Sequence, residues 1–185
     1  MSSRYIFVIS GPSGVGKTSV VSELLRVRSG ITQVLSFTTR GIRSNEIDGE
    51  HYHFITKDVF NAMLARGDFV ESTEIFGNMY GISKSCILNI LETRHALLVP
   101  NWQGYLELKK AFGNRVIGVF LMPPSFNILR ERLTHRSTDS EEEIERRMAR
   151  AHEDMSKCDL YDYKLINHTI YDTVYELAKI FDNVR

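Results

Sequence analysis

The pattern of hydrophobic and polar residues changes period along the chain, from continuous apolar runs typical of buried strands to spacings typical of helices. The two strongest apolar runs, Tyr5–Ser10 and Arg115–Met122, end at glycines or prolines and predict buried strands. Shorter runs predict strands at Gln33–Phe37, His51–Ile55, Phe69–Ile75, Ala96–Val99 and Tyr163–Ile166. Helices are predicted at Thr18–Val27, Lys57–Arg66, Ser83–Thr93, Trp102–Phe112, Phe126–Thr134 and Asp172–Val184. This alternation favours a mostly parallel sheet covered by helices on both faces.

Composition narrows the class of protein. With 185 residues, of which 43% are hydrophobic and 25% charged, the chain fits one globular domain. Its 23 basic and 23 acidic residues balance, which argues against a protein held to nucleic acid by bulk positive charge. No apolar run reaches the roughly 20 residues of a membrane-spanning helix, and the start is unlike a secretory signal. We expect a cytoplasmic protein with two free thiols, Cys86 and Cys158, and an oligomeric state open between monomer and homo-oligomer.

A glycine-rich loop joins the first strand to the first helix and matches the pattern G-x-x-x-x-G-K-[ST]. Its residues are Gly11, Pro12, Ser13, Gly14, Val15, Gly16, Lys17 and Thr18. Glycines let backbone amides surround phosphate oxygens, and the helix adds its positive end. Lys17 would reach the β- and γ-phosphates, and the Thr18 hydroxyl would hold Mg²⁺. The alternative, a plain turn between strand and helix, is disfavoured by this context, so the loop indicates binding of a nucleoside triphosphate.

A second group of polar residues lies between positions 36 and 80. Hydroxyls and guanidiniums come close together in the sequence at Ser36, Thr38, Thr39, Arg40 and Arg43, followed by Glu46, Gly49, Tyr52, Phe54, Glu71 and Tyr80. Two arginines and a tyrosine hydroxyl can bind a second phosphate. A carboxylate such as Glu71 can accept two hydrogen bonds from guanine, from N1–H and the 2-amino group. Taken singly, each of these residues could instead be solvated or packed.

These residues carry a resemblance to the guanylate kinase family, which extends over nearly the whole chain. Every fixed position of the family's signature is met, by Thr38-Thr39-Arg40, Arg43, Glu46, Gly49, Tyr52 and Phe54. The resemblance implies a three-layer P-loop NTPase fold of the α/β class, with ATP and GMP as substrates and Mg²⁺ as cofactor. It implies a core formed by residues 1–35, 95–125 and 160–185, a GMP-binding subdomain at 36–94 and a helical lid at 126–159.

The resemblance also assigns roles to individual residues. The phosphate of GMP would contact Arg40, Arg43, Tyr52 and Tyr80, whereas Ser36 and Glu71 would contact the guanine. ATP would bind the glycine-rich loop from Gly11 to Thr18, with Asn167 at the adenine. The implied catalytic residues are Lys17, Arg40, Arg132, Arg136 and Arg147.

Two of those roles have ordinary structural alternatives. Ser140 and Glu143 fit a capping box at the start of a lid helix, in which Arg147 could simply pair with Glu143. Asn167 could equally be a turn residue.

The chain departs from the family pattern around the expected guanine pocket. The family has an Asp-x-Asp where this chain has Val99-Pro100-Asn101, and a Ser or Thr where it has Ile82. The accepting phosphate is already largely ionised at neutral pH, so phosphoryl transfer needs no general base. We expect a working kinase with weaker or altered nucleotide preference, because a lost hydrogen bond to a charged group costs about 1.5–3 kcal/mol.

Two other functions remain open from the sequence. One is a related P-loop kinase that acts on another phosphate ester, such as a ribose bisphosphate. The other is a non-catalytic module that binds a phosphorylated protein at the former GMP site. The complete signature disfavours the first, and the intact Gly16, Lys17 and Thr18 disfavour the second.

Overall fold

The computed structural model describes residues 4–44, 46–75, 77–136 and 140–184, and only the backbone of residues 135 and 136. Its centre is a parallel five-stranded sheet with the strand order β2-β7-β1-β8-β9. The strands are β1 (Ile6–Ser10), β2 (Ile31–Gln33), β7 (His95–Leu98), β8 (Val116–Met122) and β9 (Tyr163–Ile166). Since β1 is the middle strand, the glycine-rich loop that follows it lies at the carboxyl edge of the sheet, where α/β proteins bind ligands.

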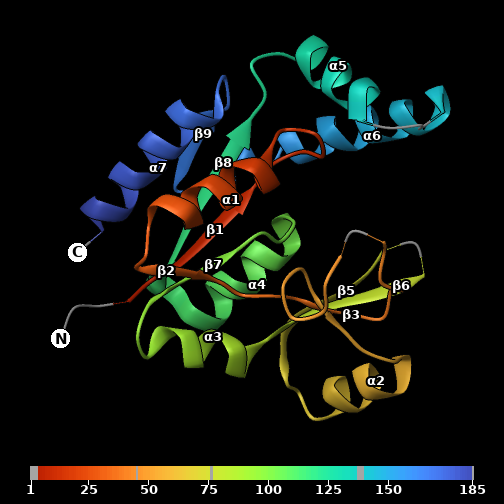
Figure 1. Ribbon diagram of the computed structural model, residues 1–185, viewed down its shortest axis with the longest axis vertical. Coiled ribbons are helices and arrows are strands. Elements are labelled where there is room, and N and C mark those ends of the chain that lie inside the picture. The colour runs from red at the N-terminus through yellow and green to blue at the C-terminus, as the bar shows by residue number, and fades with distance from the viewer. Residues whose placement is uncertain (1–3, 45, 76, 137–139, 185) are drawn as a thin grey trace.

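Alternating side chains of β1 divide the hydrophobic core between the two faces of this sheet. Phe7 and Ile9 pack with α1 (Lys17–Val27) and α7 (Ile170–Asn183). Ile6 and Val8 pack with α3 (Lys84–Leu91) and α4 (Trp102–Phe112) on the opposite face. The result is the helix–sheet–helix sandwich of Figure 1, and the predicted three-layer α/β fold is confirmed.

A smaller sheet extends from the core at the lower right of Figure 1. It has the strand order β4-β3-β6-β5 and is accompanied by α2 (Lys57–Ala65). Its strands are β3 (Phe37–Thr38), β4 (His53–Phe54), β5 (Phe69–Ile75) and β6 (Asn78–Ser83). In the antiparallel β5–β6 pair, Glu71 lies opposite Ile82 and Thr73 lies opposite Tyr80. These four side chains therefore share one face of the sheet.

Two helices extend beyond the other end of the core, at the top of Figure 1. They are α5 (Phe126–Arg136) and α6 (Glu141–Met155), and they bury a small cluster of their own, made of Leu129, Leu133, Ile144, Met148 and Ala151. The predicted cap at Ser140 is present, since its hydroxyl accepts a hydrogen bond from the amide of Glu143 at 3.3 Å. Ser125 caps α5 in the same way, accepting from the amide of Ile128 at 3.2 Å. Short 3-10 helices, η1 (Gly113–Arg115) and η2 (Cys158–Leu160), precede β8 and β9.

The helices and long strands agree with the sequence prediction, but three short strands differ. The strand β6 was not predicted, because its stretch Asn78–Ser83 contains a glycine and little alternation. The predicted strand Gln33–Phe37 does not form as one strand, because β2 ends at Gln33 and β3 begins at Phe37, in different sheets. Of the predicted His51–Ile55, only β4 is a strand. No helix of the described residues is long and apolar enough to span a membrane. Cys86 and Cys158 form no disulfide.

One glycine of the central sheet is required by close packing. A Cβ atom on Gly118 would lie 2.5 Å from the ring of Tyr105, which is 1% exposed and packs against β8. We expect Gly118→Ala to lower the free energy of unfolding by about 1–3 kcal/mol through overpacking, measured by urea denaturation. Gly30→Ala is the matched control, since its Cβ would meet no atom within 4 Å. Equal stability of both variants would contradict this packing.

Candidate active site

The glycine-rich loop is closely packed against the ends of the neighbouring strands. Gly11 and Gly16 have positive φ angles of 145° and 104°, which residues with a Cβ rarely adopt. A Cβ on Gly11 would lie 2.3 Å from the carbonyl oxygen of Leu121, and one on Gly16 would lie 2.6 Å from Asn167 Nδ2. The loop then continues directly into α1 at Lys17, so that helix presents its unpaired amides to the loop.

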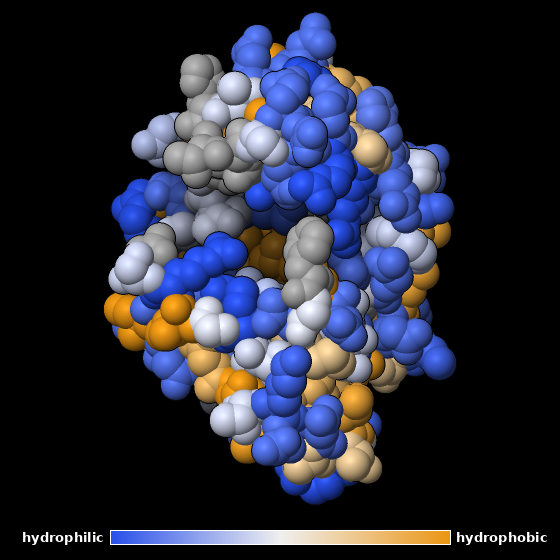
Figure 2. Space-filling model, turned by 90° about the vertical axis from the view of Figure 1, so that its right-hand side faces the viewer, coloured by the Kyte–Doolittle hydropathy of each residue, from blue (hydrophilic) through white to orange (hydrophobic). Residues whose placement is uncertain are grey.

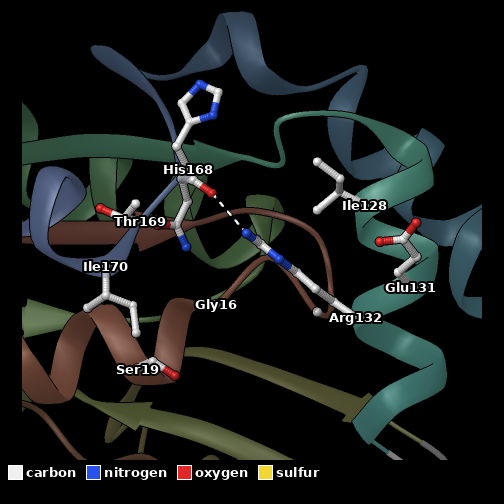
Figure 3. Close-up of a pocket in the computed structure, with 10 residues that line it drawn as sticks. Gly16, Ser19, Ile128, Glu131, Arg132, His168, Thr169 and Ile170 are labelled. Carbon is white, nitrogen blue, oxygen red and sulfur yellow. Dashed lines mark hydrogen bonds between the residues drawn. The ribbon is translucent and has the colours of Figure 1, made fainter.

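Asn167 and Arg132 hold this loop from the other side. The Asn167 side chain is buried; its Nδ2 donates to Val15 O at 2.8 Å, and its Oδ1 accepts from Thr173 Oγ1 at 2.8 Å. Arg132 donates to Val15 O at 3.3 Å and to Asn167 O at 3.2 Å, the bond dashed in Figure 3. Both ends of the Asn167 amide are thus used within the protein, and its contact with adenine stays a prediction.

A cavity of about 620 Å³ opens beside the loop, between α5 and the start of α7. Ile128 and Ile170 flank it from opposite sides in Figure 3, and Arg132 reaches across it from α5. Gly14, Gly16 and Ser19 form the side that belongs to the loop and α1. Two aliphatic side chains beside a phosphate-binding loop suit a flat apolar base whose phosphates continue into the loop.

Lys17 and Thr18 line a second cavity, of about 560 Å³, together with Tyr52 and Val99. The ammonium group of Lys17 donates to Gly11 O at 2.6 Å and to Pro12 O at 2.9 Å, so it lies folded over its own loop. The Thr18 side chain is exposed at this cavity. A hydroxyl in this position can take one coordination site of Mg²⁺, which prefers oxygen ligands and keeps several waters.

Arg40 is fixed by a carboxylate of the same signature segment. Its guanidinium donates to both oxygens of Glu46, at 3.0 and 2.7 Å, and also to Gly41 O at 2.8 Å. It lies 5.5 Å from the ring centroid of Tyr52 and 5.6 Å from that of Phe54. The hydrogen bond with Arg40 lowers the pKa of Glu46 to about 2 and raises the pKa of Arg40. Glu46 therefore stays ionised at physiological pH and orients Arg40.

The remaining predicted phosphate contacts surround this pair. Glu46 also accepts a hydrogen bond from the backbone amide of Arg43 at 3.0 Å, and the Arg43 side chain is exposed. The rings of Tyr52 and Tyr80 meet edge to face with centroids 6.0 Å apart. The structure thus brings Arg40, Tyr52 and Tyr80 together, with Arg43 at the rim.

Glu71 lies at a cavity of about 250 Å³ that is also lined by Ser36, Tyr52, Tyr80, Ile82, Val99 and Asn101. Its neighbour across the strands is the apolar Ile82, and a Cβ on Gly104 of α4 would lie only 3.2 Å from Glu71 Cδ. Burial raises the pKa of Glu71 to about 7, and the nearby carboxylate of Glu107 adds to this increase. A base that donates hydrogen bonds would favour the ionised form of Glu71.

Comparison with known proteins agrees with this geometry. The model of the family described as guanylate kinase matches residues 3–184. The chain belongs to the guanylate kinase family. The guanylate kinase of Alkalilimnicola ehrlichii is 42% identical over 177 residues, which cover 95% of this chain and 87% of that protein. The guanylate kinase of the Wolbachia of Brugia malayi is 41% identical over 181 residues, covering 97% and 93%.

A solved structure of the guanylate kinase family has the same arrangement of elements. The crystal structure of guanylate kinase from Anaplasma phagocytophilum superposes with a TM-score of 0.80 at 30% sequence identity. The superposition covers 98% of this chain and 86% of the other. Membership of the guanylate kinase family makes this protein an enzyme of the kinase class.

The departures from the guanylate kinase pattern have a structural explanation at Asn101. Its Oδ1 accepts a hydrogen bond from the amide of Gly104 at 2.9 Å and caps the start of α4. The adjacent Pro100 carbonyl accepts from the Ser10 hydroxyl at 2.7 Å. Val99 is apolar and packs beside the core. The end of β7 therefore carries a helix cap and apolar packing in the place of the family's acids.

The predicted lid arginines differ in how they are placed. Arg132 lies over the glycine-rich loop, as described above, whereas Arg147 lies 3.5 Å from a carboxylate oxygen of Glu143 on its own helix. Arg146 pairs with the same carboxylate at 2.6 Å. In this conformation α6 thus shows the surface pairing considered as the alternative for Arg147. The side chain of Arg136 lies outside the described residues.

Residues of α6, and one that follows η2, approach the loop although they were not predicted. Arg150, Asp154 and Tyr161 line a cavity of about 220 Å³ together with Lys17 and Asn101. Burial raises the pKa of Asp154, while the charges of Lys17 and Arg150 oppose this increase. The Tyr161 hydroxyl is buried beside the Ser10 side chain. The spacing of Arg150 and Asp154, one helical turn apart, was the available sequence signal.

The raised pKa of Glu71 predicts that stability depends on pH. Between pH 4.5 and 7 the unfolded chain releases this proton and the folded chain keeps it, so the free energy of unfolding falls as pH rises. The expected loss is roughly 2–3 kcal/mol across this range. Glu71→Gln cannot ionise and should be more stable than the native protein at pH 8, but not at pH 4. Urea denaturation at both pH values measures the free energy of unfolding of the two proteins. The same difference between variant and native protein at pH 4 and pH 8 would contradict the prediction.

Proposed function

We propose that this protein transfers the γ-phosphoryl group of ATP to GMP, producing ADP and GDP. The observation that carries the proposal is the position of Tyr52 and Val99 between two cavities. Both residues line the cavity of Lys17 and Thr18, and both line the cavity of Glu71. A triphosphate on the glycine-rich loop and a monophosphate beside Tyr52 would therefore face each other across one space. Figure 2 shows a hollow between the upper and lower parts of the molecule, with hydrophilic side chains around it.

The donor site is supported by the packing of the loop. Adenine would lie between Ile128 and Ile170, and its phosphates would follow the amides of the loop toward Lys17. Arg132, which already spans the loop carbonyl of Val15 and the backbone of Asn167, would contact the phosphates by a small side-chain movement. Each of these contacts neutralises charge that a triphosphate brings.

Mg²⁺ fits this site as an ion that arrives with ATP. Thr18 can supply one hydroxyl ligand, and no group of three or more His, Cys, Asp or Glu among the described residues could hold a metal. Water and phosphate oxygens would complete the coordination, as Mg²⁺ commonly requires. Bound there, the ion would neutralise charge on the β- and γ-phosphates.

The acceptor site would use the small sheet as a separate GMP-binding subdomain of residues 36–94. The phosphate of GMP would contact Arg40, Arg43, Tyr52 and Tyr80. Tyr52 and Tyr80 line the Glu71 cavity, and the Arg40 guanidinium lies 5.5 Å from the ring centroid of Tyr52. Ser36 and Glu71 line the same cavity and would contact the guanine. Ionised Glu71 accepts from both N1–H and the 2-amino group, a donor pair that guanine presents.

Catalysis by this arrangement is mainly positioning and charge neutralisation. The accepting phosphate oxygen is largely ionised at neutral pH, so no residue needs to remove a proton. Lys17 would leave the carbonyls of Gly11 and Pro12 for the transferring phosphoryl group. The lid, residues 126–159, would close so that Arg136 and Arg147 join it, with Arg147 exchanging Glu143 for phosphate. Closure would also exclude water, which otherwise competes as acceptor.

This function places the protein in purine nucleotide metabolism and in the recycling of GMP, in the cytoplasm. Its partners would be the two nucleotides, with neither nucleic acid nor membrane involved. The balance of 23 basic and 23 acidic residues supports the expected absence of nucleic acid, because proteins held to nucleic acid by bulk charge carry a basic excess.

The proposal is tested by incubating purified protein with ATP, Mg²⁺ and GMP and measuring ADP and GDP. We expect equal amounts of both products, and a loss of at least about a hundredfold in kcat for Lys17→Ala. Lys84→Ala, an exposed change at the start of α3, is the matched control and should retain full activity.

Other outcomes of this assay would support the alternatives. Absence of GDP at high enzyme concentration would contradict the proposal. Turnover of a ribose bisphosphate in its place would favour the related kinase. Binding of a phosphopeptide without any turnover would favour the non-catalytic module.

The contact between Arg40 and Glu46 predicts a selective effect on GMP. Glu46→Gln removes the charge that orients Arg40 while keeping a similar shape, so we expect the KM for GMP to rise about ten- to hundredfold. The KM for ATP should stay unchanged, because Glu46 lines none of the cavities beside the loop.

Glu23→Gln is the matched control for this change. It breaks a similar two-bond contact with Arg26 on the surface of α1, at 2.9 and 2.7 Å. An equal rise in KM for both nucleotides in Glu46→Gln would show that Glu46 acts on the fold rather than on the GMP site.

A further inference from the structure

The floor of the Glu71 cavity is formed by one face of the β5–β6 pair. Glu71 and Thr73 point from β5, and Ile82 and Tyr80 lie opposite them on β6. Ile82 is 4% exposed and belongs to the core cluster on this side of the sheet. The residue directly beside the base-reading carboxylate is therefore aliphatic and offers a base neither donor nor acceptor.

At the opposite wall of the cavity, at the end of β7, the hydrogen-bond acceptors already bind other groups of the protein. Asn101 Oδ1 accepts from Gly104 N at 2.9 Å, and the Asn101 carbonyl accepts from Tyr105 N at 3.0 Å. The carbonyl of Pro100 accepts from Ser10 Oγ at 2.7 Å. Because the amide oxygen of Asn101 faces the Gly104 N–H, the end that remains is the NH₂ group, which can only donate.

Gly104 places these two walls on either side of Glu71. A Cβ on Gly104 would lie 3.2 Å from Glu71 Cδ, so the first turn of α4, which Asn101 caps, lies against the carboxyl group. Positions 82 and 101 thus flank the group that would accept from the base edge. Ser36 and Thr73 add neutral hydroxyls, whose hydrogen bonds are about half as strong as those to a charged group.

The three common purines differ at the edge that would meet Glu71. Guanine donates from N1–H and from a 2-amino group, which carries two hydrogens. A single carboxylate that accepts from N1–H can accept from only one of these two hydrogens. Hypoxanthine keeps N1–H and the 6-oxo group but has only C2–H in place of the amino group. Adenine presents an acceptor at N1, which opposes an ionised carboxylate.

A cavity with further acidic residues would offer a charged acceptor to the second hydrogen of the 2-amino group. The described lining of the Glu71 cavity does not. Among the described residues that line this cavity, Glu71 is the one with a charged side chain, and Ile82 and Val99 add aliphatic surface. A hydrogen left without a partner costs binding energy, whereas C2–H of hypoxanthine suits an aliphatic wall. A site rejects an analogue strongly only when the analogue leaves the site's own polar groups unpaired.

We infer that the protein also phosphorylates 6-oxopurine nucleoside monophosphates without a 2-amino group, with inosine monophosphate (IMP) as the probe, because Ile82 and Asn101 leave that group a single charged partner. This rests on the proposed function, since it concerns the acceptor site of the same reaction. Ile82 and Asn101 are then the residues that set discrimination between GMP and IMP.

The test compares kcat/KM for GMP, IMP and AMP with saturating ATP and Mg²⁺ at pH 8. One missing charge-assisted hydrogen bond corresponds to roughly ten- to hundredfold, so we expect IMP within about a hundredfold of GMP. AMP should be far poorer than either. A kcat/KM for IMP about ten-thousandfold below that for GMP would overturn the inference while leaving the proposed function intact. Absence of turnover with GMP as well would instead contradict the proposed function.

Two matched pairs of variants test the residues themselves. Ile82→Thr adds a hydroxyl acceptor beside Glu71, whereas Ile82→Val changes size without adding one. Asn101→Asp can cap α4 with one oxygen and keep a second for the base, whereas Asn101→Ser can only cap.

We expect Ile82→Thr and Asn101→Asp to raise the GMP-to-IMP ratio of kcat/KM by roughly five- to fiftyfold. The ratio should stay within about twofold of the native value in the two control variants. An unchanged ratio in both acceptor variants would overturn the assignment of these positions. The two positions lie on different elements, so a variant that fails to fold at one leaves the other informative.

Discussion

The close packing of the glycine-rich loop against β8 and β9 is the constraint on which the rest of the site depends. Gly11 leaves no room for a Cβ beside the Leu121 carbonyl, and the Asn167 amide bridges Val15 O and Thr173. The loop conformation is thus imposed by residues more than a hundred positions away in the sequence. Because these contacts lie within the protein itself, they orient the amides of the loop in advance of any ligand.

Three cations of the proposed site have acidic or carbonyl partners in this conformation. Arg40 is held by Glu46, Arg147 lies beside Glu143, and Lys17 lies on loop carbonyls within the field of Asp154. In the proposed mechanism, phosphates would therefore replace existing contacts rather than meet bare charges. The zero net charge of the chain is consistent with this pairing, since its 23 basic residues are matched by 23 acidic ones.

The sequence predicted those parts of the protein that depend on local signals. The glycine-rich loop, the caps at Ser125 and Ser140 and most helices follow from short-range patterns, and the signature gave the residues around Arg40. The strand β6 was missed because its stability comes from pairing with β3 and β5 rather than from its own residues. The cap made by Asn101 and the approach of Asp154 to Lys17 depend on tertiary positions, which one sequence does not encode at short range.

Asn101 has an inferred role in nucleotide selection and an observed role as the N-terminal cap of α4. The atom that could read a base is the atom that starts α4, and this helix carries Tyr105 and Leu108 into the core. Loss of such a cap costs about 0.5–2 kcal/mol, so most replacements at this position would weaken the fold whatever they do to the nucleotide. Only a side chain that can still cap α4 would allow the nucleotide preference to change without a loss of stability. Few residue types at position 101 meet this condition. In the role inferred for Asn101, a change in acceptor preference is therefore limited by the free energy of unfolding that the fold can lose.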